Sequence, residues 1–184
     1  MSNTPSNMLP LGTTAPSFKL LDTVTSSPKE LEGTRGPIGT MLVFICNHCP
    51  FVVHVSPKLA ELSREYIAKG IHFVAISSND IQKYPQDSPS EMKLFAERYG
   101  FSFPYLYDAT QEVAKAYDAA CTPDFYLFDK DLSLVYRGQF DSSRPGNGIP
   151  VTGVDLQGAM DALVDGRAVD TVQKPSMGCN IKWK

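Results

Sequence analysis

The chain has 184 residues, of which 42% are hydrophobic and 20% charged, and its formal net charge is −3. This is the composition of an ordinary globular protein with a substantial core, and it argues against nucleic-acid binding through a basic face. No apolar run approaches the length that spans a membrane, so we expect no membrane partner. The polar N-terminus also lacks the basic and apolar regions of a secretory signal. We therefore expect a cytoplasmic protein, in which a Cys-x-x-Cys pair is more often catalytic or metal-binding than structural.

The N-terminal part of the chain is expected to be the least regular. Residues 1–10 are rich in Ser, Asn, Thr and Pro. We expect them to form a flexible arm ahead of a single domain over residues 11–184. Phe18 and Leu20 alternate with polar neighbours, which predicts a short strand. Residues 31–39 carry three glycines and a proline and should form a turn.

Two buried strands with a long helix between them follow. The apolar, β-branched runs 41–45 and 71–77 predict the strands. Between them, apolar residues recur every three to four positions, which predicts a helix over about 48–69 that ends at Gly70. Pro57 falls inside this helix and should kink or interrupt it, because its ring crowds the preceding turn and it has no amide proton.

Apolar spacing and turn residues predict the elements of the second half. We expect helices over 91–99, 110–120 and 155–165, a short strand at 104–108, a hairpin of 124–129 with 132–136, and an irregular tail to Lys184. Strands that alternate with helices and end in a hairpin are typical of an α/β fold, with a central mixed sheet flanked by helices.

Cys46 and Cys49 stand where the first buried strand meets the long helix. Unpaired amides at a helix N-terminus favour negative charge and so lower the pKa of a nearby thiol. We expect Cys46 to be the exposed nucleophile, with a depressed pKa, and Cys49 to be the more buried resolving thiol of a reversible disulfide. The alternatives are inert core thiols or half of a zinc site. Zinc usually needs four ligands in close pairs, so we expect no metal.

Three further residues are candidates for a redox role. His48 lies between the two cysteines and, when protonated, would stabilise the Cys46 thiolate; otherwise it is a solvent-facing spacer. Cys121 precedes Thr122-Pro123 and is either an additional redox thiol or a small buried residue. Cys179 lies in the C-terminal tail and is either a resolving or regulatory thiol or simply free.

The chain resembles the thioredoxin fold and, more narrowly, its peroxiredoxin-like branch, which is related to the AhpC/TSA and TlpA/ResA groups. The segments that carry the resemblance are Gly12 to Leu20, the run Cys46-Asn47-His48-Cys49-Pro50, Thr122-Pro123-Asp124, Tyr136 to Asp141, and the tail from Gly178. The resemblance implies a thioredoxin-like fold with an N-terminal extension or hairpin. It also implies a cis Thr122-Pro123 bond that faces the cysteines and a loop there that offers its backbone to a substrate polypeptide.

The resemblance and the cysteine pair together predict a thiol–disulfide oxidoreductase. Its partners would be protein disulfides or dithiols and a thiol reductant, with no cofactor. One alternative is an antioxidant thiol peroxidase that uses Cys49, but the peroxiredoxin motif Pro-x-x-x-Thr-x-x-Cys is absent in either register. The buried acid of thioredoxins is also missing, because Thr40 stands at its position. The other alternative is a redox-responsive binding module without turnover.

Overall fold

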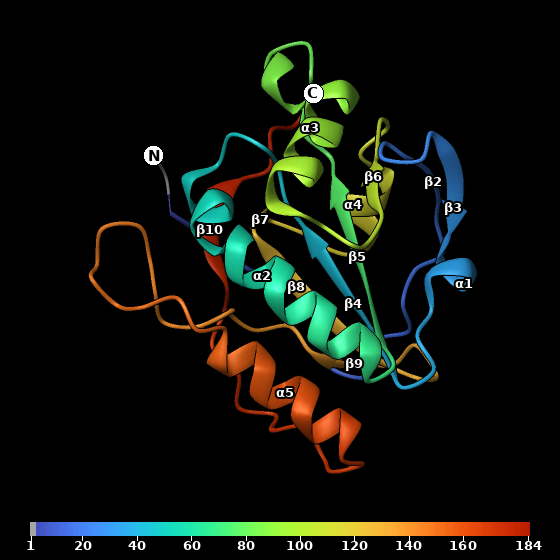
Figure 1. Cartoon of the computed structure of the whole chain (residues 1–184), viewed down its shortest axis with the longest axis vertical. Helices are drawn as coiled ribbons and strands as arrows, with labels where there is room; N and C mark the ends of the chain where they lie inside the picture. The colour runs from blue at the N-terminus through green and yellow to red at the C-terminus, as the bar shows by residue number, and fades with distance from the viewer. Residues whose placement is uncertain (1–2) are drawn as a thin grey trace.

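A computed structural model describes residues 3–184. A seven-stranded mixed sheet forms the centre of the molecule, in the order β3-β2-β6-β5-β4-β8-β9 (Figure 1). The elements are β1 (Thr4–Pro5), β2 (Lys19–Asp22), β3 (Ser27–Glu30), α1 (Leu31–Thr34), β4 (Gly39–Phe44), α2 (Pro50–Ala68), β5 (Ile71–Ser77), the 3-10 turn η1 (Pro85–Asp87), α3 (Pro89–Tyr99), β6 (Tyr105–Tyr107), α4 (Glu112–Ala116), β7 (Cys121–Thr122), β8 (Asp124–Asp129), β9 (Leu134–Tyr136), α5 (Val154–Val164) and β10 (Met177–Asn180).

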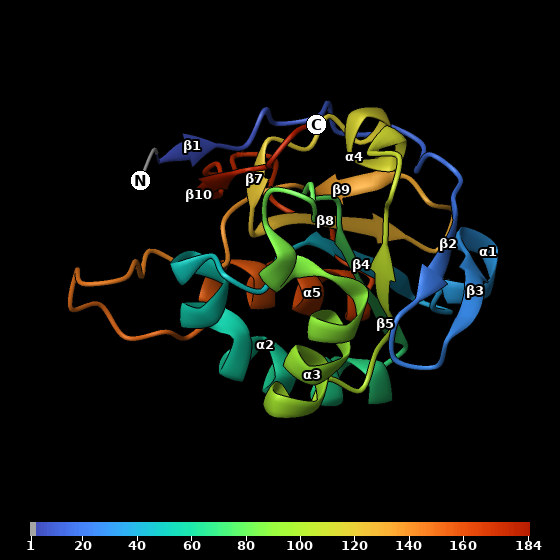
Figure 2. The ribbon, with the colours of Figure 1, turned by 90° about the horizontal axis from the view of Figure 1, so that it is seen from above.

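The centre of the sheet is buried on both faces. All six residues of β4 are buried, and β4 pairs in parallel with β5 and antiparallel with β8. Met41, Val43 and Ile45 pack into one apolar cluster with α2, α3 and α5, whereas Leu42 and Phe44 pack into a second cluster with α4. Figure 2 shows these helices on their two sides of the sheet. The fold class expected from the sequence, a mixed sheet flanked by helices, is confirmed.

The regular elements of the sequence prediction are also present. β5 and the β8–β9 hairpin lie where the apolar runs predicted them, and β2 pairs with β3 as an N-terminal hairpin. Helix α2 continues through Pro57 without an interruption. Its buried face runs across that point, from Val52 and Val55 to Leu59, and packing of this face holds the helix together. Among the described residues, no helix has the length and apolarity needed to cross a membrane.

The two ends of the chain differ from the sequence prediction. The tail expected to be irregular contains β10, which is the middle strand of a small sheet in the order β1-β10-β7. The residues expected to form a flexible arm are instead placed against it: Thr4 pairs with Gly178, and the Ser6 amide donates to Ser176 at 2.8 Å. Only Met1 and Ser2 of the expected arm lie outside the described residues.

Candidate functional site

The cysteine pair lies at the end of β4, where the chain turns into α2. Pro50 is the first residue of α2, which makes Cys49 its N-cap residue and leaves Cys46 three positions upstream. Both side chains are buried, Cys46 with 1% and Cys49 with 0% exposure. The expectation of an exposed Cys46 is therefore wrong in this reduced state. The hydroxyl of Thr122, the last residue of β7, lies 3.5 Å from Cys46 Sγ.

The loop that covers the pair contains the expected cis peptide bond between Thr122 and Pro123. The Thr122 carbonyl oxygen lies 3.3 Å from Cys49 Sγ, so a single residue contacts both sulfurs, one through its side chain and the other through its backbone. The position that the resemblance implied for Thr122-Pro123, facing the cysteines, is confirmed.

A third thiol completes the cluster. Cys179 belongs to β10 and pairs with Thr122, and its Sγ lies 2.7 Å from Cys49 Sγ. Cys121 belongs to the same strand pair but points elsewhere, with its thiol 3.6 Å from the Pro123 carbonyl. Burial raises the pKa of Cys121 far above its ordinary value. Of the two additional cysteines singled out in the sequence, the structure therefore brings only Cys179 to the pair.

The acidity of the pair is opposite to the sequence prediction. Hydrogen bonding with Cys46, and to a lesser extent with Cys179, lowers the pKa of Cys49 to about 5 despite its burial. The same bond to Cys49, together with burial and the nearby Asp87 carboxylate, holds the pKa of Cys46 well above its ordinary value. Cys49 is thus the more acidic thiol of the pair. The backbone of Val52, in the first turn of α2, adds to the lowering of its pKa.

His48 is bound to a carboxylate that the sequence analysis missed. Its Nδ1 lies 2.6 Å from Asp87 Oδ2, and its ring stacks on Tyr84. The His48 side chain keeps 23% exposure, whereas Asp87 has none. His48 is therefore no solvent-facing spacer. It links the buried cysteine site to the surface.

Asp87 is fixed by several donors at once. Its Oδ1 accepts from the Asn47 amide at 2.8 Å, and its Oδ2 accepts from Asn79 at 2.9 Å as well as from His48. These bonds, with that from His48 the strongest, keep the pKa of Asp87 below its ordinary value although burial opposes this. Asp87 lies in a polar loop before α3, and nothing in the residue pattern of that loop distinguished it from a solvated acid.

The donor atoms of Cys46, His48 and Asp87 all lie within 4.8 Å of one another, a spacing that a metal ion could use. Both Asp87 oxygens, however, already accept hydrogen bonds from protein groups. The arrangement is thus a hydrogen-bonded network in which Asp87 orients His48 beside Cys46.

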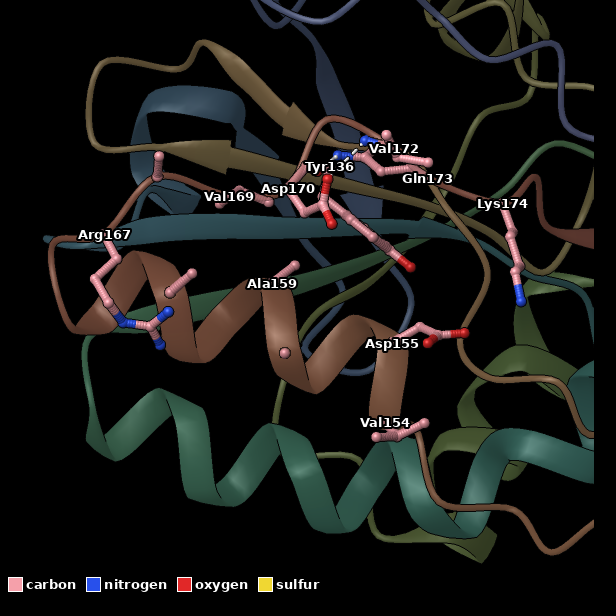
Figure 3. Close-up of a pocket in the computed structure, with 13 residues that line it drawn as sticks. Tyr136, Val154, Asp155, Ala159, Arg167, Val169, Asp170, Val172, Gln173 and Lys174 are labelled. Carbon is pink, nitrogen blue, oxygen red and sulfur yellow. Dashed lines mark hydrogen bonds between the residues drawn. The ribbon is translucent and has the colours of Figure 1, made fainter.

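A pocket of about 370 Å³ lies elsewhere, between α5 and the chain segment that follows it (Figure 3). Asp155 and Ala159 of α5 and Asp170 and Lys174 of the segment line it, and none of the four cysteines does. The chemistry suggested by the sequence and this pocket are therefore at different places on the molecule.

Comparison with known proteins assigns the chain to a family. The family model described as "AhpC/TSA family" matches residues 11–137, more than half of the chain. This chain belongs to the AhpC/TSA family. The matched residues include β4, the Cys46–Cys49 pair and the cis-proline segment, whereas β10 with Cys179 lies beyond them.

The relatives agree with this assignment at different distances. An uncharacterized conserved protein from Geobacillus kaustophilus is 58% identical, with a TM-score of 0.98 over 100% of this chain and 97% of its own. The thiol-disulfide oxidoreductase ResA of the same organism is 31% identical over 66% of this chain, which spans 64% of ResA, less than two thirds of its length. The thioredoxin domain of a Bacteroides vulgatus thiol-disulfide oxidoreductase is 17% identical with a TM-score of 0.59, covering 70% of this chain and 88% of that domain, and shows the thioredoxin-like fold.

Proposed function

We propose that this AhpC/TSA-family protein is a thiol–disulfide oxidoreductase that cycles between a Cys46–Cys49 dithiol and a Cys46–Cys49 disulfide. The observation that carries this proposal is the pair of buried thiols at the N-terminus of α2, both in contact with Thr122 and with the pKa of Cys49 lowered to about 5. A thiolate is the species that attacks disulfides. The similarity to ResA, a thiol-disulfide oxidoreductase by name, supports the same activity.

We assign the attack on substrate to Cys46 and the resolving step to Cys49. Cys46 lies beside the partly exposed His48, whereas Cys49 is enclosed between Cys46 and Cys179. A proton moves along the hydrogen bond from Cys46 to Cys49, and the Cys46 thiolate attacks one substrate sulfur. The other substrate sulfur leaves as a thiolate and takes a proton. Cys49 then attacks Cys46, which forms the Cys46–Cys49 bond and releases the second substrate thiol.

The substrate class is disulfides in one direction and dithiols in the other, with a thiol as the reductant that regenerates the pair. Protein substrates that pair with the backbone of Thr122 meet an obstacle, because β10 already occupies that edge. Such a substrate must displace β10. A small disulfide that enters beside His48 needs only local movement of the loops around Cys46.

The test is disulfide exchange by the reduced protein with glutathione disulfide and with a disulfide-containing protein such as insulin. We expect wild-type protein to form the Cys46–Cys49 disulfide and to turn over with a thiol donor. Cys46→Ser should lose turnover. Cys49→Ser should accumulate mixed disulfides through Cys46 that a reductant releases. Failure of the wild-type protein to form the Cys46–Cys49 bond at any glutathione ratio would overturn the proposal.

Two parallel assays separate the other classes of function. Peroxide consumption that depends on Cys49 but survives in Cys46→Ser would identify a peroxidase, with Cys49 oxidised to a sulfenic acid. Stoichiometric oxidation without turnover would identify a redox-responsive binding module. We expect neither result.

A further inference from the structure

Cys179 is held against the reactive pair by the backbone of the protein. β10 pairs antiparallel with β7 so that Cys179 stands opposite Thr122, the residue that contacts both pair sulfurs. Cys179 Sγ lies 2.7 Å from Cys49 Sγ. A disulfide bond measures about 2.05 Å, so these two sulfurs need to close by well under about 1 Å to be bonded.

The strand that carries Cys179 is fixed on both sides. β1 pairs with it along its other edge, with Thr4 opposite Gly178. A side chain at Gly178 would lie 1.9 Å from the Thr122 carbonyl oxygen, so the two backbones approach as closely as only glycine permits. Beyond the strand, the Lys182 amide donates to Asn79 Oδ1 at 2.9 Å. Cys179 is therefore a built-in neighbour of Cys49 and not a thiol on a loose tail.

The edge that β10 occupies is the one that the thioredoxin resemblance assigns to a substrate polypeptide. An extended segment that adds to a sheet edge places alternate side chains into the site it borders. Here the added segment is part of the same chain, and the side chain it places in the site is a cysteine with 8% exposure. Cys179 thus belongs to a segment that lies on the substrate edge, and its sulfur contacts Cys49, the resolving thiol.

We propose that Cys179 is a third redox thiol that exchanges with the Cys46–Cys49 disulfide of the proposed function. The Cys179 thiolate attacks Cys49 Sγ, the Cys46–Cys49 bond breaks, and Cys46 leaves as a thiolate that takes up the proton lost by Cys179. A Cys49–Cys179 bond forms, and no oxidant is consumed because one disulfide replaces another. The product stores the oxidised state at Cys49 while it returns Cys46 to the thiol form next to His48.

The test equilibrates Cys46→Ser protein in glutathione redox buffers, followed by acid quench, alkylation and peptide mapping. Glutathione that becomes attached to Cys49 should be displaced by Cys179. We expect loss of the glutathione adduct and a peptide pair linked through Cys49 and Cys179. The matched control is the double variant Cys46→Ser/Cys179→Ser, in which one glutathione should stay on Cys49. Cys46→Ser/Cys121→Ser should behave like Cys46→Ser, because Cys121 contacts neither sulfur.

The linked Cys49–Cys179 peptide pair can also be sought in partly oxidised wild-type protein. This measurement needs no substitution, so it remains valid if the variants do not fold. The inference is overturned if Cys46→Ser protein has a native circular dichroism spectrum and yields no linked pair. If that variant does not fold, the absence of the linked pair from wild-type protein overturns it. The proposed function is judged separately. It fails if wild type and Cys179→Ser form no Cys46–Cys49 disulfide, whereas the inference alone fails if they form that disulfide and Cys179 always remains free.

Discussion

His48 Nδ1 lies 2.6 Å from the buried Asp87 Oδ2, so the residue between the two cysteines belongs to a hydrogen-bonded pair and does not act alone. The two members of this pair have opposite effects on a neighbouring thiolate. The Asp87 carboxylate contributes to the raised pKa of Cys46. The histidine, which lowers the pKa of that carboxylate, offsets its charge.

The first prediction is that the two partners shift the redox potential in opposite directions. His48→Ala leaves the Asp87 carboxylate beside the thiols without its histidine partner, disfavours the thiolate of the reduced form, and should make the disulfide less oxidising. Asp87→Asn removes that negative charge and should make the disulfide more oxidising. A change of about 30 mV corresponds to about 1.4 kcal/mol for this two-electron couple. Equilibration with glutathione buffers measures it, and shifts of the same sign would indicate structural damage only.

The second prediction concerns which cysteine is the thiolate. Because the pKa of Cys49 is lowered to about 5, its thiolate should persist as the pH falls from 8 to about 6 and disappear through pH 5. Ultraviolet absorbance of the reduced protein reports the thiolate. In Cys46→Ser the serine hydroxyl can still donate to Cys49, so the absorbance change should keep its midpoint at low pH. Cys49→Ser should show no thiolate at neutral pH. A neutral-pH thiolate that survives in Cys49→Ser would contradict the assignment.

The assignment of the thiolate also shows where sequence reasoning ended. The Cys-x-x-Cys pair, the strand before it and the helix after it could be predicted from local residue patterns. Pro50 even carried the signal that Cys49 is the N-cap, since proline favours the first helical position. What the sequence could not give is the hydrogen bond from Cys46 to Cys49 or the carboxylate of Asp87, because these depend on contacts between elements far apart in the chain.

β10 illustrates the same limit for the fold. β4 and β5 are long, apolar and β-branched, so their own composition predicts them. Met177–Asn180 has a glycine and a polar residue among four, and it becomes a strand only because β1 and β7 pair with its two edges. Strand pairing of this kind is decided by tertiary context and not by local propensity.

The third prediction tests the close approach of β10 to β7. Gly178→Ala places a methyl group 1.9 Å from the Thr122 carbonyl oxygen and must push the strands apart. We expect a loss of about 2–3 kcal/mol in the free energy of unfolding, measured by urea denaturation, as for other overpacked sites. Gly158→Ala is the matched control. Gly158 lies within α5 with open space around it, so alanine should stabilise by about 0.5–1 kcal/mol. Equal changes in the free energy of unfolding for Gly178→Ala and Gly158→Ala would contradict the close approach of β10 to β7.

The fourth prediction is a pH dependence of stability that originates at Asp124. Burial raises the pKa of this carboxyl from 3.8 to about 6, although the Tyr126 hydroxyl and the Ala120 amide donate to it. The folded state therefore binds the proton more tightly than the unfolded state. The resulting stability is full below about pH 4 and is lost as the pH rises through 6. At about 1.4 kcal/mol per pKa unit, the loss is on the order of 3 kcal/mol.

Denaturation of Asp124→Asn between pH 4 and 8 isolates this contribution. The variant cannot ionise at this position, so its stability should fall less than that of wild type over the same range. Asp131→Asn, at an exposed turn, serves as the control and should follow wild type. Parallel curves for wild type and Asp124→Asn would show that Asp124 is not the group responsible.

The anchoring of β10 also sets the effective concentration of a thiol at the redox centre. A cysteine tethered at contact distance competes with free thiols at a local concentration that free solutes do not reach. An oxidised Cys49 would then react with Cys179 before it reacts with glutathione at millimolar concentration. Thr4 pairs with Gly178 and so helps to hold β10 in place. Residues at the start of the chain therefore raise the local concentration of the Cys179 sulfur at Cys49.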